Sequence, residues 1–384
     1  MSDHDLDGFR AEVRAWLESN CPEVMRDGAA GEENICWGGR NWQFQSDAQR
    51  LWLERMAARG WTVPTWPTEY GGAGLSRAED KILTEELQRL NTRLPLQSFG
   101  IWMLGPALLH FGTHEQKLEY LPAIARGEVR WCQGYSEPGA GSDLASVQTR
   151  AEIDGDDYVI NGQKVWTSYA DKADMIFALV RTDRDAPKHK GISFVLIDME
   201  TPGVTTRPIK LISGKSPFCE TFFDDARIPR SQIVGAENRG WDVAKYLLTH
   251  EREMISGGGD GLISGRPLGA VLDDAALSDA TIRAEALACE VDTLAMALTL
   301  DRYKDQAEQS EIGDASAMLK YYGTELNKRR HELMMKAGGS DALTWDGKGG
   351  LAPDWLRTKA NSIEGGTSEV MLSIVSKRVL GLPG

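Results

Sequence analysis

The chain has 384 residues, of which 41% are hydrophobic, enough for two or three compact domains with substantial cores. Its formal net charge of -14 argues against sequence-independent nucleic-acid binding, because no surplus of Lys and Arg exists to neutralise phosphates. The acidic N-terminus lacks a basic and apolar leader, and nowhere do about 18 apolar residues run together. We therefore expect a cytoplasmic globular protein without a membrane span.

Five cysteines are present, an odd number, and no two of them form a C-x-x-C pair. This pattern indicates neither a disulfide framework nor a zinc site. We expect reduced thiols and no metal centre. The cysteines are Cys21, Cys36, Cys132, Cys219 and Cys289.

The first third of the chain has the apolar spacing of amphipathic helices, at 9–17, 46–59 and 77–90. After about Gly127 the pattern changes to short β-rich runs separated by turn signals. We therefore expect a small, mainly antiparallel β domain that ends near Val234. Its predicted strands are 147–153, 158–166, 176–181 and 192–197.

Helical periods return from Gly240 onward. The predicted helices are 241–255, 276–308, 314–337, 354–360 and 368–380. Helices, then strands, then helices predict an α+β protein with separate layers rather than a doubly wound sheet. The expected domains are 1–128, 129–237 and 238–384.

Two polar segments, 132–143 and 161–168, are the most informative part of the chain. The first is a loop rich in Gly, Pro and hydroxyl groups, and its glycines allow backbone N–H groups to approach a phosphate closely. Ser136 and Ser142 can hydrogen-bond a polar ring edge or a phosphate, while Trp166 can cover an aromatic ring. These residues favour a flavin or another nucleotide without deciding between them.

Both segments resemble the two flavin-contacting stretches of the acyl-CoA dehydrogenases. Segments 111–117, 222–229 and 364–383 match other parts of the same family in the same order. The resemblance extends over essentially the whole chain and is to bacterial members. It implies an N-terminal helical domain, a central antiparallel β domain and a C-terminal four-helix bundle.

The resemblance implies FAD-dependent oxidation of an acyl-CoA thioester to the 2-enoyl-CoA, with electrons passed to an electron-transfer flavoprotein. In that chemistry a carboxylate removes the α proton while a hydride leaves the β carbon. A branched, cyclic or steroid side-chain thioester is the expected substrate, because some branched-chain, long-chain and steroid-type members carry their base at the position of Glu251.

Two glutamates match family positions for the catalytic base, which needs a desolvated carboxylate with a raised pKa. Glu251 lies on the helix expected at 241–255. Glu364 lies one residue before the position used by straight-chain members, where this chain has Gly365. We favour Glu251 and keep Glu364 as the alternative. Without the family resemblance, a solvated charge run would be the better account of Glu251, and for Glu364 the alternative account is a carboxylate favoured by the helix dipole.

The resemblance assigns further residues to ligands. Ser136 matches a hydroxyl that donates to the flavin pyrimidine ring, and Ser168 matches one that reaches flavin N5. Arg252 matches a position near the CoA thioester. Gly338 and Gly339 match a glycine pair that a neighbouring subunit brings to the cofactor. The remaining expected cofactor contacts are Gln133, Gly141, Ser142, Trp166, Thr367 and Glu369.

One family feature is missing from this sequence. The Arg-x-x-Phe-Gly segment that usually follows the base-bearing helix, and reaches the cofactor across a dimer interface, is not found. Some steroid-degrading relatives pair two unlike chains instead. The assembly expected is therefore either a homo-tetramer or an α2β2 heterotetramer. Two alternative functions also stay open: a non-catalytic or cofactor-completing subunit, and an acyl-CoA oxidase or flavin monooxygenase on the same fold.

Overall fold

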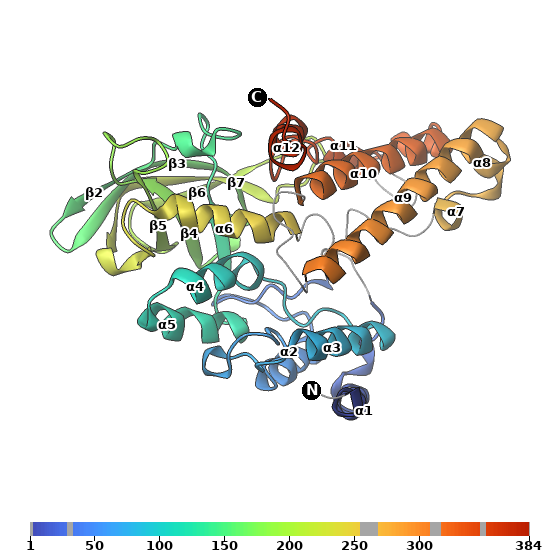
Figure 1. Ribbon diagram of the computed structural model, residues 1–384, viewed down its shortest axis with the longest axis horizontal. Coiled ribbons are helices and arrows are strands. Elements are labelled where there is room, and N and C mark those ends of the chain that lie inside the picture. The colour runs from blue at the N-terminus through green and yellow to red at the C-terminus, as the bar shows by residue number, and fades with distance from the viewer. Residues whose placement is uncertain (1–2, 29–33, 254–267, 308–315, 346–350, 384) are drawn as a thin grey trace. The chain divides into compact units, whose positions relative to one another are not determined.

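The structure is a computed structural model that describes residues 3–28, 34–253, 268–307, 316–345 and 351–383. It comprises two compact units (Figure 1). Unit 1 consists of Met1–Ala140, Leu144–Arg207 and Phe218–Ala244, and unit 2 of Gly141–Asp143, Pro208–Pro217 and Lys245–Gly384.

Unit 1 begins with helices that bury one apolar stripe each. Val13 of the first helix and Trp52 of the second are fully buried in one shared cluster, together with Leu83 of the third. Ser46 and Ser76 cap the second and third helices, which explains why their starts could be predicted from sequence. The helices are α1 (Asp3–Asn20), α2 (Asp47–Ala58), α3 (Arg77–Arg89), α4 (Gly105–Phe111) and α5 (His114–Ala125).

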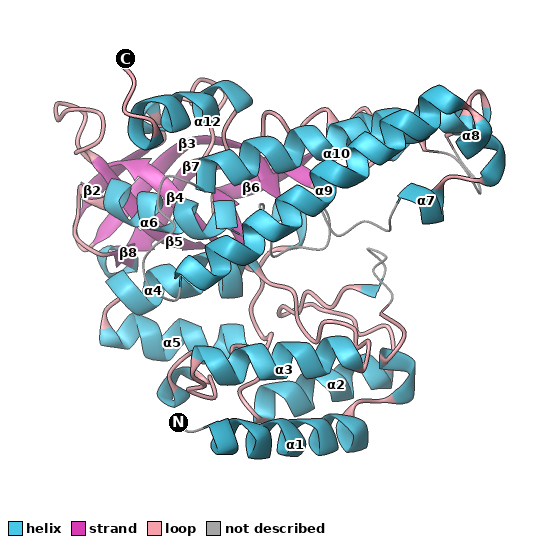
Figure 2. Ribbon diagram, turned by 45° about the vertical axis from the view of Figure 1, so that its right-hand side comes forward, coloured by secondary structure: helices cyan, strands magenta, loops and turns pink. Residues whose placement is uncertain are grey.

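The strands form one sheet in the order β6-β7-β3-β2-β4-β5-β8, with β1 pairing parallel to β4 (magenta in Figure 2). Most neighbouring strands run antiparallel, as predicted, and β1 and β2 pair parallel with β4. The strands are β1 (Trp131–Gly134), β2 (Arg150–Asp154), β3 (Asp157–Ser168), β4 (Met175–Arg181), β5 (Ile192–Asp198), β6 (Val204–Ile209), β7 (Phe218–Pro229) and β8 (Ile233–Val234).

The four predicted strands are confirmed as β2 to β5, whereas β1, β6, β7 and β8 were not predicted from their own residues. β1 and β8 are too short to show a period. β6 has no buried residue, so its sequence carries little apolar signal. Strand β7 alternates in burial, but its exposed acidic pair Asp224 and Asp225 interrupts the β-rich composition.

The described part of unit 2 after Lys245 consists mainly of helices. Helices α9 and α10 pack antiparallel, as the ion pairs Arg329 to Asp292 and Lys336 to Glu285 show. The helices after the sheet are α6 (Gly240–Glu253), which begins in unit 1, and α7 (Leu268–Val271), α8 (Asp274–Ser278), α9 (Ala280–Ala307), α10 (Ser316–Gly338), α11 (Ala352–Thr358) and α12 (Ser368–Ile374).

The single helix predicted at 276–308 is wrong at its start. The chain breaks at Asp279, whose carboxylate accepts hydrogen bonds from the backbone N–H groups of Thr281 and Ile282 and so begins α9 as a new helix. The helix predicted at 368–380 also changes character, because its second half, Val375–Val379, is a π-helix.

Helices, a central sheet and further helices follow one another along the chain, so the predicted α+β fold class is confirmed. The domain limits 1–128, 129–237 and 238–384 stay predictions. Among the described helices, none is long and apolar enough to cross a membrane.

Candidate active site

The loop after β1 is joined to the end of β3 by a backbone hydrogen bond. The carbonyl oxygen of Ser136 accepts from the backbone N–H of Val165 at 2.9 Å. Ser136 itself is half-buried, as is Gln133 on β1, which lies opposite Phe177. The structure therefore joins the two polar segments of the sequence at Ser136 and Val165, both in unit 1.

Trp166 lies at an irregularity in β3. The pairing of β3 with β7 shifts register between Lys164 and Thr167, and Trp166 between them has a left-handed φ of +62°. Its indole is 54% exposed and meets the ring of Phe218 edge-on, with centroids 6.1 Å apart. Such a bulge redirects a side chain, which here leaves an aromatic face open to a ligand.

Ser168 ends β3 two residues after Trp166, and it is half-buried. Thr167 between them is fully buried, whereas Trp166 is exposed and Ser168 is partly accessible. A Cβ added at Gly139 would meet no heavy atom within 4 Å, so the space above the loop after Ser136 is open. A flat ligand with polar edges fits this set of an exposed ring, two hydroxyls and an open loop.

The expected contacts in unit 2 are placed as follows. Gly141 and Ser142 are exposed, and a Cβ at Gly141 would also meet open space. Thr367 caps α12 by accepting a hydrogen bond from Val370 N at 3.2 Å, and Glu369 is exposed in the first turn of that helix. The N-terminus of α12 therefore presents a hydroxyl and a carboxylate.

Local structure explains why two glycines, Gly338 and Gly339, stand at the end of α10. A Cβ at Gly338 would approach the Cβ of Ala342 to 2.8 Å, and Gly339 has a φ of +54°. Both positions therefore need glycine to end the helix. Their expected contact with a cofactor in a neighbouring subunit stays a prediction.

Glu364, the alternative base, is held by a cation. Arg357 donates to both carboxylate oxygens, at 3.1 and 2.8 Å, and Asn361 Nδ2 donates to Oε1 at 2.7 Å. This bidentate pairing, with the bond from Asn361, engages both carboxylate oxygens in hydrogen bonds. A carboxylate that acts as a base needs an oxygen free to reach the substrate.

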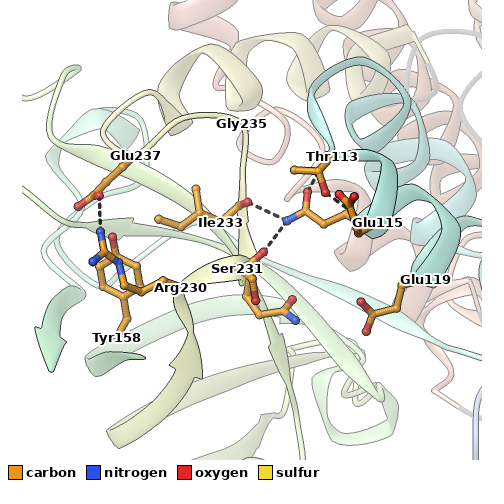
Figure 3. Close-up of a pocket in the computed structure, with 11 residues that line it drawn as sticks. Thr113, Glu115, Glu119, Tyr158, Arg230, Ser231, Ile233, Gly235 and Glu237 are labelled. Atoms are coloured by element: carbon orange, nitrogen blue, oxygen red, sulfur yellow. Dashed lines mark hydrogen bonds and ion pairs between the residues drawn. The ribbon is translucent and has the colours of Figure 1, made fainter. Parts of the chain in front are cut away.

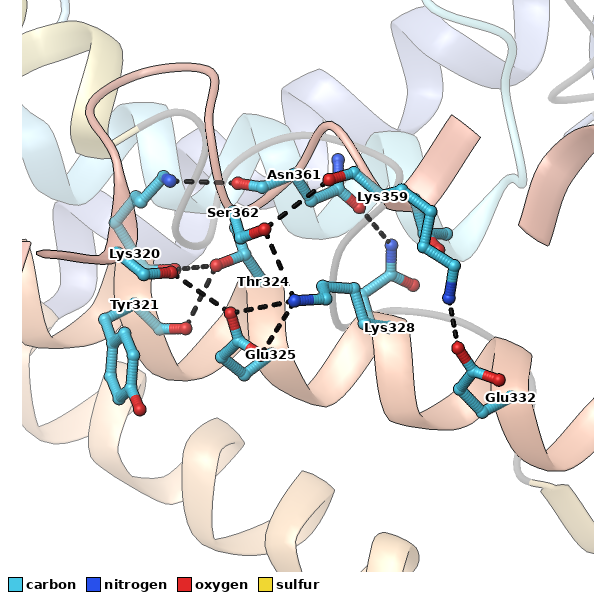
Figure 4. Close-up of polar contacts among 12 residues, drawn as sticks. Lys320, Tyr321, Thr324, Glu325, Lys328, Glu332, Lys359, Asn361 and Ser362 are labelled. Atoms are coloured by element: carbon cyan, nitrogen blue, oxygen red, sulfur yellow. Dashed lines mark hydrogen bonds and ion pairs between the residues drawn. The ribbon is translucent and has the colours of Figure 1, made fainter. Parts of the chain in front are cut away.

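A buried lysine organises the turn that carries Glu364 (Figure 4). Lys320 of α10 is fully buried and donates to the carbonyl oxygens of Asn361 at 2.9 Å and Gly366 at 2.6 Å. Asn361 also accepts from Asn327 Nδ2 at 3.0 Å. Burial lowers the pKa of Lys320. This lysine was not predicted as a structural residue, because a lone Lys in a helical pattern ordinarily indicates a surface position.

Glu251 and Arg252 lie in the last turn of α6, and their side chains are outside the described residues. The missing Arg-x-x-Phe-Gly segment also concerns a region, 254–267, that is outside the described residues. The roles assigned to Glu251 and Arg252 therefore stay predictions.

A pocket of about 650 Å³ in unit 1 lies apart from the predicted site residues, since none of them lines it (Figure 3). Gln116 of α5 bridges one side of it by donating to the carbonyl oxygens of Ser231 and Ile233, both at 2.8 Å. Arg230 lies over the ring of Tyr158, whose pKa burial raises to about 12. These contacts join α5 to the sheet and explain the local structure.

Comparison with known families decides the identity of the fold. The acyl-CoA dehydrogenase N-terminal domain matches residues 4–128, the middle domain residues 132–226 and the C-terminal domain residues 238–380. The chain belongs to the acyl-CoA dehydrogenase family. It is therefore an oxidoreductase of the acyl-CoA dehydrogenase class, and the resemblance seen in the sequence is confirmed.

Two relatives are similar along their whole length. The chain is 38% identical to acyl-CoA dehydrogenase IpdE1 of Mycobacterium tuberculosis, covering 99% of this chain and 98% of that protein. It is 36% identical to the acyl-CoA dehydrogenase IpdE1 of Mycolicibacterium smegmatis, with the same coverage. Each match therefore spans nearly the whole length of both proteins.

Two solved dehydrogenase structures are also similar. The Tcur3481-Tcur3483 steroid acyl-CoA dehydrogenase matches with a TM-score of 0.78 and 31% identity, covering 100% of this chain and 99% of that one. The ChsE4-ChsE5 complex from Mycobacterium tuberculosis matches with a TM-score of 0.68 and 27% identity, covering 100% of this chain and 99% of that one. Each of these structures pairs two differently named chains.

Proposed function

We propose that this acyl-CoA dehydrogenase uses FAD to oxidise a steroid side-chain or related branched acyl-CoA thioester to the 2-enoyl-CoA. The observation that carries the proposal is the pairing of the loop at Ser136 with the bulge at Trp166, in a chain that is 31% identical to a steroid acyl-CoA dehydrogenase. An electron-transfer flavoprotein is the proposed electron acceptor. This substrate class and acceptor go beyond what family membership establishes.

FAD, when bound, supplies the acceptor for the hydride that leaves the β carbon. Trp166 covers the ring system, while Ser136 and Ser168 donate hydrogen bonds to its polar edge. Gln133, Gly141, Ser142, Thr367 and Glu369 complete the proposed contacts, with Gly338 and Gly339 supplied by a neighbouring subunit. Arg252 binds the CoA thioester through its guanidinium.

Glu251 is the proposed base that removes the α proton. Helical spacing puts position 251 one turn after Leu247 and two turns after Val243, both of which are buried. The proposed chemistry calls for a desolvated carboxylate, and a position in line with this buried stripe suits that need. Glu364 is disfavoured because Arg357 and Asn361 occupy its oxygens.

Replacing each glutamate separately tests this assignment. Glu251→Gln keeps the size of the side chain and removes the base, so we expect at least a 100-fold fall in the rate of anaerobic flavin reduction, with flavin content retained. Glu364→Gln is the matched control and should keep most of the rate. Normal turnover in Glu251→Gln together with loss in Glu364→Gln would transfer the role to Glu364.

A second candidate function is a subunit that completes the cofactor site of an unlike chain. The absent Arg-x-x-Phe-Gly segment favours it, as does the pairing of unlike chains in the two similar solved structures. In an α2β2 heterotetramer the two functions are compatible, because this chain can bring the base while its partner brings cofactor contacts. Reconstitution with a co-expressed relative separates the two cases.

A further inference from the structure

A buried ion pair lies between the two cofactor segments of unit 1. Lys164 Nζ and Glu137 Oε1 are 2.7 Å apart, and their side chains are 0% and 7% exposed. Lys164 also donates to the carbonyl oxygens of Tyr135 at 3.2 Å and Leu179 at 2.6 Å. All three ammonium protons therefore have an acceptor, so the lysine has one fixed position.

The carboxylate of Glu137 is equally engaged. It accepts hydrogen bonds from the backbone N–H groups of Gln148 at 2.6 Å and Thr149 at 2.9 Å, besides the one from Lys164. Although burial opposes ionisation, these donors hold the pKa of the Glu137 carboxyl below its usual value. The pair thus links the loop after β1, the start of β2, and strands β3 and β4.

Each partner adjoins a residue proposed to contact the cofactor. Glu137 directly follows Ser136, and Lys164 comes two residues before Trp166. Lys164 is also the last residue of β3 in register with β7, opposite Thr221, before the shift that produces the bulge. Glu137 follows Ser136 and Lys164 precedes Val165. The ion pair therefore fixes the backbone on both sides of the hydrogen bond from Val165 N–H to the Ser136 carbonyl oxygen.

Stability alone does not explain this arrangement. Burial lowers the pKa of Lys164 to about 8, which reflects the cost of taking the ammonium out of water. Apolar side chains of similar volume commonly stabilise such a position as well or better. An apolar pair makes no directional hydrogen bonds. The left-handed backbone at Trp166 is strained, so it persists only where the surrounding contacts hold it in place.

We propose that Lys164 and Glu137 are positioning residues, which hold the Ser136 hydroxyl and the Trp166 ring at the spacing that the bound cofactor needs. The role rests on the proposed FAD binding. It acts through Ser136 and Trp166, and neither charged group contacts the ligand itself. A planar, phosphate-bearing cofactor binds to the preformed pair of segments without having to order them.

The test compares two substitutions in the pair with one elsewhere in unit 1. Lys164→Met removes the cation, and Glu137→Gln keeps the side-chain shape if the first variant does not fold. Glu86→Gln is the matched control, because Glu86 is a buried carboxylate of α3 held by Arg14, with a salt bridge of 2.8 Å. All are purified as the wild type is, with a partner chain where the assembly needs one.

The readouts are FAD dissociation constants by flavin fluorescence, and amide hydrogen exchange of Val165 in the flavin-free protein. We expect either pair variant to weaken FAD binding by about tenfold or more and to accelerate exchange at Val165, Gln148 and Thr149. Glu86→Gln should lower the melting temperature yet leave FAD affinity within about twofold.

The positioning role would be overturned if the pair variants bind FAD as tightly as the wild type. It would also be overturned if they bind FAD no more weakly than Glu86→Gln does at an equal loss of stability. A wild-type protein that binds no FAD, alone or with its partner chain, would overturn the proposed function and this role with it. Wild-type binding with unaltered pair variants refutes the positioning role alone, so the two failures are distinguishable.

Discussion

Trp166 combines two features that rarely occur together in a strand, a left-handed backbone and an indole that is 54% exposed. Each is unfavourable by itself, since a non-glycine residue at positive φ costs on the order of 1–3 kcal/mol. The proposed cofactor, by covering the ring, would account for their coincidence at the end of the strand. A protein without that ligand would gain stability from a regular strand at this position.

Replacing Trp166 by Leu should weaken FAD binding by about three- to tenfold, because ring stacking contributes about 0.5–1.5 kcal/mol beyond buried area. The melting temperature should change little, since the exposed indole contributes little to the core. Fluorescence titration with FAD measures the effect. Trp345→Leu is the matched control, because Trp345 is 47% exposed in unit 2 and not among the proposed contacts. Equal losses in both variants would contradict a specific role.

The residues of the site differ in how far the sequence revealed them. Ser136, Trp166 and Ser168 were predicted from the motifs they share with the family, and the hydrogen bond from Val165 to Ser136 joins the two segments that carry them. The buried partners Glu137 and Lys164 were missed, because a charged residue beside a turn or in a strand ordinarily points to solvent. Only the folded sheet shows that β3 and the loop after β1 enclose both charges.

At the level of elements, one buried carboxylate fastens α3 to α1. Glu86 of α3 accepts hydrogen bonds from Arg10 and Arg14 of α1, and from Arg89 of its own helix. The hydrogen bonds, chiefly that from Arg14, lower the pKa of Glu86 to about 2. The ionised carboxylate is therefore part of the packing between these two helices.

This pKa predicts how acid affects stability. Because the pKa of Glu86 is lower in the folded than in the unfolded chain, its contribution is fully present above the ordinary value of 4.5 and is lost as the pH falls toward 2. Glu86→Gln should therefore lower the free energy of unfolding at neutral pH by on the order of 2 kcal/mol. Urea denaturation of both proteins at neutral pH and near pH 3 measures the difference, which should shrink in acid. A pH-independent difference would contradict the assignment.

Lys320 has a comparable role in unit 2, where it fastens the turn before α12 to α10 through two backbone carbonyls. Lys320→Met leaves those buried acceptors without a donor, at an expected cost of about 2–3 kcal/mol in the free energy of unfolding. Lys328→Met, about two turns further along α10, is the control. The Lys328 side chain is 25% exposed, so its replacement should cost less than about 1 kcal/mol. Denaturant unfolding compares the two. A smaller loss at Lys320 than at Lys328 would contradict the role.

The elements that the sequence predicted share local signals. Capped, amphipathic helices such as α2 and α3 and the strands β2 to β5 are specified by their own residues. Strand β6 has no buried residue, and the start of α9 depends on Asp279 acting as a cap inside a continuous helical pattern. Such features depend on neighbours that local periodicity does not encode.

The whole molecule combines the dehydrogenase fold with an incomplete set of expected cofactor contacts. The three family domains match the chain nearly end to end, yet the Arg-x-x-Phe-Gly segment is missing. The two similar solved structures pair unlike chains. We therefore expect an unlike partner to supply cofactor contacts to this chain.

This expectation predicts the flavin content of the purified protein. The chain expressed alone should carry clearly less than one FAD per chain, because part of the cofactor's contact surface is missing. Co-expression with a neighbouring relative should raise the ratio and yield an α2β2 assembly, as measured by visible absorbance and light scattering. A stoichiometric FAD homo-tetramer formed by this chain alone would contradict the heteromeric account.

The measurement that tests the central claim most directly is anaerobic mixing of the FAD-loaded assembly with a steroid side-chain acyl-CoA. The account predicts rapid loss of the oxidised flavin absorbance and, by mass spectrometry, a thioester product that lacks two hydrogens. Retention of the oxidised flavin spectrum, with the thioester recovered unchanged over a panel of branched and steroid side-chain substrates, would contradict it.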